Sequence, residues 1–203
     1  MSSSAGTAEL RVIPVTDAPW DDVRTVFGTR GDPSTCWCQF FKVDAAVWKA
    51  QDVPFFESSL CEQVDAARAD HHAGPGVLAY LDSTPVGWAA VEPRPAYPRV
   101  LTSRVIPASA ETDLGDAGVW AVTCFVVRVG YRRRGVGAAL LAGAVEEARN
   151  GGARVVEAYP VDTAGEKVSS ADLYHGPLSS FVAAGFEITG RPVDGRAVVR
   201  LAL

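Results

Sequence analysis

The chain has 203 residues and a formal net charge of −5. This length fits one domain with a sizeable core, and the acidic balance argues against a protein that coats nucleic acid, which usually presents a basic face. The N-terminus lacks the charged start and apolar run of a signal peptide, and no apolar stretch is long enough to cross a bilayer. We therefore expect a cytoplasmic protein with neither a nucleic-acid nor a membrane partner.

The first half of the chain alternates short strands with amphipathic helices. The expected elements are a strand at 10–15, a helix that starts after Thr16 or Asp17 and ends at Gly28, a helix from about Pro54 to His71, and a hairpin of strands at 77–81 and 86–91. Residues 31–41 follow no regular pattern, and the aromatic residues in and after them suit either the core or the wall of an acceptor site.

A Cys-Trp-Cys triplet holds Cys36 and Cys38 within this irregular segment. A zinc site needs a second ligand pair at matching spacing, which Cys61, His71 and His72 do not provide. Cysteines at alternating positions of an extended segment point the same way and commonly line a core. We predict packing or pocket lining for both cysteines, and no metal site.

A long proline-rich segment from Glu92 to Gly118 precedes the central stretch of the sequence. Connections of this length within a compact domain are usually functional or flexible. Its position just ahead of the central strand makes it a candidate rim of the acceptor site, to which it could contribute Glu111, Asp113 and Asp116.

The central stretch, from Trp120 to Gly151, has the pattern of a strand, a tight basic loop and a helix. The apolar run at 121–129 is rich in β-branched and aromatic residues and is typical of a buried strand. After the loop, apolar residues recur at helical spacing as far as a glycine pair at 151–152. A helix N-terminus leaves backbone amides unpaired and carries a partial positive charge, and glycines let a large anion approach them. The loop is therefore predicted to bind an anion.

Two well-known glycine loops do not fit this segment. A P-loop needs Lys and then Ser or Thr after its second glycine, but Gly135 is followed by Val136 and Gly137. A dinucleotide fingerprint needs a third glycine at the position of Leu140. Neither a nucleoside triphosphate nor a dinucleotide is the predicted ligand.

An Arg-x-x-Gly-x-Gly pattern at Arg132, Gly135 and Gly137 follows the strand residues Phe125 and Val127. This combination resembles the acyl-coenzyme A signature of the GNAT-type N-acetyltransferase superfamily. The resemblance implies that the loop amides hold the pyrophosphate of coenzyme A and that the strand backbone pairs with its pantetheine arm. The residues implied are Phe125, Val126 and Val127 for the pantetheine, and Arg132, Arg133, Arg134, Gly135, Val136, Gly137 and Ala138 for the pyrophosphate. The competing interpretation is a basic turn that only joins a strand to a helix.

The rest of the chain continues an α/β pattern. The expected elements are a strand at 153–160, a polar segment at 162–171, a short helix from 178 that ends at Gly185-Phe186, and a hairpin of 187–191 and 197–203. This order resembles the GNAT fold, a central twisted mixed sheet of about six to seven strands flanked by helices, in which two parallel strands splay apart around the acyl group. We expect a flexible tail at residues 1–9 and a single acetyltransferase domain at 10–203.

Acetyl transfer to an amine needs a proton for the departing thiolate. In the family this proton often comes from a tyrosine four residues before the glycine of the Gly-Phe pair, a position that Phe181 occupies here. Tyr174 and His175 are the nearest alternatives. A phenol, with a pKa of about 10, suits a thiolate better than an imidazole does, so Tyr174 is the predicted general acid.

The general base is harder to place. The glutamate that some histone-modifying members carry near the start of the central strand corresponds to Ala121. Glu92, Glu157 and the acids of the 92–118 segment remain, although each has the pattern of a solvated surface carboxylate, and a base acting through water leaves no mark in a sequence.

Three functions compete at this point. The predicted function is an N-acetyltransferase that moves an acetyl group from acetyl-CoA directly to a primary amine of a small molecule or peptide. A catalytically degenerate module that binds or senses acyl-CoA is the alternative, which Phe181 and Ala121 both permit. A purely structural domain is disfavoured because three arginines beside closely spaced glycines pack poorly. The sequence leaves the amine acceptor undefined and a homodimer open.

Overall fold

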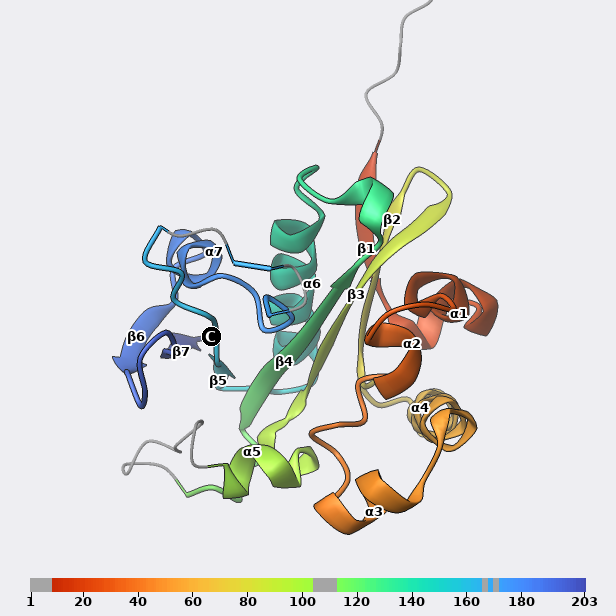
Figure 1. The fold of residues 1–203 in the computed structure, drawn as a ribbon, viewed down its shortest axis with the longest axis horizontal. Helices are drawn as coiled ribbons and strands as arrows, with labels where there is room; N and C mark the ends of the chain where they lie inside the picture. Colours follow the sequence, from red (N-terminus) through yellow and green to blue (C-terminus); the bar gives the residue numbers. More distant parts are fainter. Residues whose placement is uncertain (1–8, 104–112, 166–167, 170–171) are drawn as a thin grey trace, which may run out of the picture.

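The computed structural model describes residues 9–103, 113–165, 168–169 and 172–203, arranged around a seven-stranded sheet (Figure 1). The strands are β1 (Leu10–Pro14), β2 (Gly76–Leu81), β3 (Thr84–Pro93), β4 (Val119–Val127), β5 (Val155–Ala158), β6 (Glu187–Gly190) and β7 (Val198–Ala202), in the order β1-β2-β3-β4-β5-β7-β6. Only the β4–β5 pair is parallel; the other neighbouring pairs are antiparallel. The predicted mixed sheet of six to seven strands is confirmed.

Helices cover both faces of this sheet (Figure 1). The helices are α1 (Trp20–Phe27), α2 (Pro33–Cys36), α3 (Ala45–Ala50), α4 (Val53–Ala69), α5 (Pro98–Thr102), α6 (Val136–Asn150) and α7 (Leu178–Ala183), with 3-10 turns η1 (Val15–Asp17), η2 (Arg94–Ala96) and η3 (Val129–Tyr131). One face packs against α6 and α7, and the opposite face packs against α1 and α4. Among the described residues, no helix is both long and apolar enough to span a membrane.

Residues 92–103, the first part of the proline-rich segment, have more secondary structure than the sequence predicted. Strand β3 continues through Glu92 to Pro93, and η2 and α5 follow. The expectation of an irregular loop was wrong here because Pro95 and Pro98 sit in the first turns of these elements, where a fixed φ favours helical geometry. Residues 104–112, including the candidate carboxylate Glu111, lie outside the described part of the chain.

Two glycines allow α6 to lie directly on the sheet. A Cβ atom at Gly87 of β3 would come within 2.9 Å of Val136 and Leu140, and one at Gly143 of α6 within 2.4 Å of Val12. Both approaches are too close for any larger residue. The N-terminus of α6 is therefore held firmly at the end of β4.

Strands β4 and β5 separate halfway along β4. Their pairing ends at Val122 and Ala158, whereas β4 continues to Val127. On the other side of β4 the register with β3 shifts after Val122, so Thr123 is an extra residue that forms a β-bulge. The bulge bends β4 away from β5 at the point where the pairing stops.

The space between the separated strands is filled by residues 174–178. The Phe125 amide donates a hydrogen bond to the Tyr174 carbonyl (2.6 Å), and the Val161 amide donates to the Gly176 carbonyl (2.9 Å). The Leu178 amide returns a bond to the Val161 carbonyl (2.8 Å). This segment, which we call the splay segment, lies beside β4 much as a short strand would.

Candidate active site

The loop between β4 and α6 ends in an open helix N-terminus. The first bond of the helix runs from the Ala139 amide to the Gly135 carbonyl (3.0 Å), so the amides of Val136, Gly137 and Ala138 have no partner within the helix. Gly135 has a φ of 79° and no side chain to cap the helix. These amides are therefore free to bind an anion.

The surroundings of this N-terminus are spacious and positively charged. A Cβ atom built on Gly135 or Gly137 would meet nothing within 4 Å. Arg133 and Arg134 are exposed, and neither takes part in an ion pair with the described residues. The predicted pyrophosphate residues, 132–138, thus lie together around open space at one end of β4.

The strand residues predicted to bind the pantetheine have backbone amides that point alternately toward β3 and away from it. The Arg128 amide donates to Val86 of β3 (3.0 Å) and the Phe125 amide donates to Tyr174 on the other side. By the alternation of an antiparallel ladder, the Val126 amide points toward β3 and the Val127 amide points away from it. Phe125 and Val127, but not Val126, therefore direct backbone amides into the gap beyond β5.

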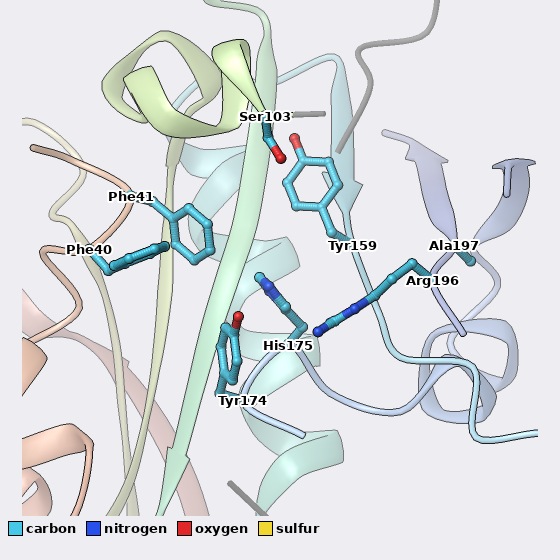
Figure 2. Close-up of a pocket in the computed structure, with 8 residues that line it drawn as sticks. All are labelled: Phe40, Phe41, Ser103, Tyr159, Tyr174, His175, Arg196 and Ala197. Carbon is cyan, nitrogen blue, oxygen red and sulfur yellow. The ribbon is translucent and has the colours of Figure 1, made fainter. Parts of the chain in front are cut away.

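A cavity of about 310 Å³ lies where β4 and β5 separate (Figure 2). The residues that line it are Phe40, Phe41, Ser103, Tyr159, Tyr174, His175, Arg196 and Ala197. They come from the segment after α2, the end of α5, the end of β5, the splay segment and the turn before β7. The sequence-predicted acid Tyr174 is therefore part of this wall, together with an arginine that no sequence pattern had indicated.

The polar groups of the cavity wall influence one another. Burial raises the pKa of the half-buried Tyr174 phenol above its usual value, and the neighbouring Arg196 guanidinium opposes that rise. Burial, reinforced by the charge of Arg196, lowers the pKa of His175 from 6.5 to about 3. His175 is therefore a neutral imidazole at physiological pH, and its buried Nδ1 has no hydrogen-bond partner.

The low pKa of His175 predicts that acid destabilises the fold. In the unfolded chain this histidine binds a proton near pH 6.5, whereas in the folded protein it stays neutral until about pH 3, so stability falls as the pH drops through that window. Between pH 7 and pH 5 the loss from this group is about 2 kcal/mol. Urea unfolding at both pH values should show a smaller loss for His175→Gln than for the exposed control His72→Gln; equal losses would contradict the assignment.

The model of the acetyltransferase (GNAT) family matches residues 42–175, more than half of the sequence. The chain belongs to the GNAT family of acetyltransferases. It is accordingly an acyl-CoA-dependent transferase. A comparison with curated proteins found no significant match.

Solved structures share the fold of this acetyltransferase at low sequence identity. YncA from Salmonella typhimurium, solved with its cofactor acetyl-CoA, is 14% identical with a TM-score of 0.53, covering 96% of this chain and 94% of the other. Ribosomal-protein-alanine N-acetyltransferase from Brucella melitensis is 16% identical with a TM-score of 0.52, covering 95% and 99%. PaiA N-acetyltransferase from Thermoplasma acidophilum, in complex with coenzyme A, is 12% identical with a TM-score of 0.50, covering 97% and 99%.

Two glutamates flank the position where some relatives were expected to carry a base. Ala121 of β4 pairs with Glu92 of β3 on one side and with Glu157 of β5 on the other. Both were expected on the surface of the acetyltransferase, and this was wrong. Glu157 is 1% exposed and Glu92 forms an ion pair with the buried Lys42.

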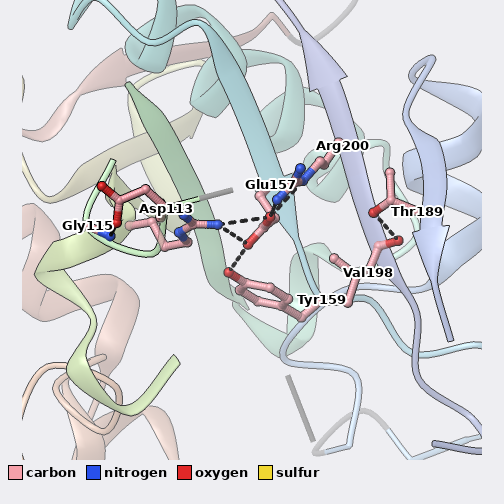
Figure 3. A network of polar contacts seen from close by, with 8 residues as sticks. Asp113, Gly115, Glu157, Tyr159, Thr189, Val198 and Arg200 are labelled. Carbon is pink, nitrogen blue, oxygen red and sulfur yellow. Dashed lines mark hydrogen bonds and ion pairs between the residues drawn. The ribbon is translucent and has the colours of Figure 1, made fainter. Parts of the chain in front are cut away.

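Glu157 is held in a closed network of polar contacts (Figure 3). Its carboxylate accepts bonds from Arg200 (2.5 and 2.8 Å), from Arg94 (3.3 Å) and from the Tyr159 hydroxyl (2.6 Å). Because two guanidinium groups neutralise it, Glu157 stabilises the sheet and positions Tyr159 rather than acting as a base.

The remaining predicted candidates lie elsewhere. Asp113 accepts a bond from the Gly115 amide (2.9 Å), and Asp116 pairs with Arg154, so neither lines the cavity. Cys38 is buried in the core, Cys36 is partly buried, and both are free thiols. Within the described residues, no group of three His, Cys, Asp or Glu side chains is arranged to hold a metal ion.

Proposed function

We propose that this enzyme transfers an acetyl group from acetyl-CoA directly to a primary amine of a small molecule or peptide. The observation that carries the proposal is the open, positively charged N-terminus of α6 beside the half of β4 that is not paired with β5, with the cavity where the two strands separate. The structural neighbours solved with acetyl-CoA or coenzyme A support the same donor.

In this proposal the loop residues 132–138 hold the pyrophosphate. The free amides of Val136, Gly137 and Ala138 and the open space at Gly135 fit a large anion. The backbone of Phe125 and Val127 takes the pantetheine arm. The Phe125 amide is engaged by Tyr174 in this structure, so donor binding exchanges that hydrogen bond and shifts the splay segment.

The proposed transfer forms a bond between the amine nitrogen and the acyl carbon and breaks the bond from that carbon to sulfur. The amine gives up a proton, and the departing thiolate takes one. Tyr174 lines the cavity and carries an ionisable hydroxyl, so we propose it as the proton donor to sulfur. His175 suits this role less well because a neutral imidazole with a pKa of about 3 is not protonated at physiological pH.

The alternative function is an acyl-CoA binding or sensing module without turnover. Two observations favour it: the position of the expected acid is taken by Phe181, which is 1% exposed, and neither Glu92 nor Glu157 reaches the cavity. Both functions require donor binding and differ only in turnover.

The test measures donor binding and turnover separately. Acetyl-CoA at saturation is expected to raise the melting temperature of the purified protein, and thiol release with a panel of primary amines should exceed the rate without amine. Tyr174→Phe should lower kcat by roughly 100-fold, the size of a lost general acid, without changing the thermal shift. No thermal shift would refute both functions, a shift without turnover would favour the sensing module, and an unchanged kcat would remove Tyr174 as the acid.

We further propose a cytoplasmic location, which the four free cysteines support because persistent free thiols are typical of reducing compartments. Size-exclusion chromatography with light scattering measures whether the enzyme is a monomer or a homodimer.

A further inference from the structure

The cavity wall carries an unusual balance of charge. Of its lining residues, Arg196 alone has a formal charge at neutral pH, because His175 is neutral and the others are aromatic, hydroxyl or apolar. Among the residues that the structure describes, no carboxylate lines the cavity. A cationic acceptor such as a polyamine would find no counter-charge in this wall, although the whole chain is acidic.

Arg196 interacts with the Tyr174 side chain, but one of its guanidinium nitrogens has no partner. Its Nη1 atom is buried and makes no hydrogen bond, and Arg196 forms no ion pair with the described residues. Two carboxylates of neighbouring segments are engaged with other arginines: Asp162 pairs with Arg191, and Glu157 pairs with Arg200. A buried guanidinium nitrogen without a partner is costly, and the planar fork of arginine matches a carboxylate.

His175 is a second buried polar group in the wall with one unpaired nitrogen. His175 is 3% exposed and its Nδ1 has no hydrogen bond. Figure 2 shows His175 next to the end of the Arg196 side chain, with Tyr174 close by. The rings of Phe41 and His175 lie 5.3 Å apart, so the imidazole packs against an aromatic side chain of the cavity wall.

We propose, resting on the function proposed above, that the acceptor is a small primary amine that also bears a carboxylate, in the manner of an α-amino acid with an apolar or aromatic side chain. Arg196 binds the carboxylate, the Nδ1 of His175 accepts a hydrogen bond from the amine, and Phe40, Phe41 and Tyr159 contact the apolar part. A volume of about 310 Å³ is at the small end of ligand pockets, roughly 300–1,000 Å³, and suits a single small molecule.

The proposal is tested with pairs of amines that differ only in the carboxylate. Thiol release from acetyl-CoA is measured for phenylalanine, leucine and methionine, for the amines that lack their carboxyl groups, and for their amides. Each amino acid is expected to exceed its two partners in kcat/KM by roughly 10- to 100-fold, the size of a charge-assisted hydrogen-bonded contact. The proposal is overturned if the decarboxylated amine, the amide or a tripeptide amide has a kcat/KM equal to or higher than that of the amino acid.

Variants of Arg196 identify the group responsible. Arg196→Met should lower kcat/KM for the amino acids by more than it does for the decarboxylated amines, so that the preference for the carboxylate is lost. Arg196→Lys should restore part of the preference because a point charge replaces the fork. Arg191→Met is the matched control, an exposed arginine of the same turn that pairs with Asp162. An unchanged preference in Arg196→Met overturns the proposal.

Measuring acetyl-CoA binding distinguishes failure of the proposed carboxylate site from failure of the proposed acetyltransferase function. The acetyl-CoA thermal shift should be the same in the wild type and in Arg196→Met, which also shows that the variant is folded. If acetyl-CoA binds but no amine is turned over, the amino acids should still raise the melting temperature of the wild type and not of Arg196→Met. Absence of both turnover and this Arg196-dependent shift rejects the carboxylate site and leaves donor binding standing.

Discussion

Replacing Glu157 with Gln is expected to destabilise the protein by about 3–5 kcal/mol. The side chain of Glu157 is 1% exposed and is the shared partner of Arg94, Arg200 and Tyr159. Its neutralisation leaves two guanidinium groups beside the sheet without their counter-charge, and Arg94 is itself buried. Urea unfolding at pH 7 measures the effect.

The matched control for Glu157→Gln is Glu146→Gln. Glu146 also pairs with an arginine, Arg149, but both side chains are more than half exposed on α6. Because an exposed pair contributes little, this variant should change the stability by no more than about 0.5 kcal/mol. Similar losses for the two variants would show that burial of the Glu157 network has no special effect.

Substitution of Gly137 by Val is expected to weaken acetyl-CoA binding by roughly 100-fold while leaving the fold intact. A Cβ atom at Gly137 meets nothing within 4 Å, so the protein itself has room for the new side chain. The same room is where we propose that the pyrophosphate lies, and loss of one or two charge-assisted bonds to it accounts for an effect of this size. Isothermal titration measures the affinity and thermal unfolding the stability.

Ala142→Val controls for the added bulk, because Ala142 is exposed on the same helix beyond its first turn. It should bind acetyl-CoA as the wild type does. Retained affinity in Gly137→Val would mean that the anion lies elsewhere, and loss of stability in that variant would mean that the space around Gly137 is needed by the protein itself.

The strand, loop and helix that form the proposed donor site could be predicted from the sequence because their determinants are contiguous. Three local patterns follow one another in the chain: the apolar run that ends at Val127, the glycines at 135 and 137, and the helical spacing after Val136. They predict a strand, a loop and a helix in that order. The structure placed them as a strand, a loop and a helix with bounds that differ by about two residues.

The acceptor side could not be predicted in the same way because it depends on strand register and on chain segments far apart in the sequence. Phe41, Tyr174 and Arg196 meet only through the fold, and each is unremarkable in its local pattern. The burial of Glu157 likewise depends on Arg94, which arrives from the segment after β3. A glutamate with no charged partner nearby in the sequence is expected on the surface. Glu157 is buried instead because the fold brings Arg94 and Arg200 to it.

The splay segment also covers part of a strand edge within the sheet. Beyond Val122, strand β4 has lost β5 as a neighbour, and its backbone groups there form an edge in the middle of the sheet. The bond from Phe125 to Tyr174 covers part of that edge with the protein's own backbone. An uncovered strand edge can pair with a strand of another chain. The splay segment therefore protects the part of β4 that we propose to bind the pantetheine arm from pairing with a second polypeptide.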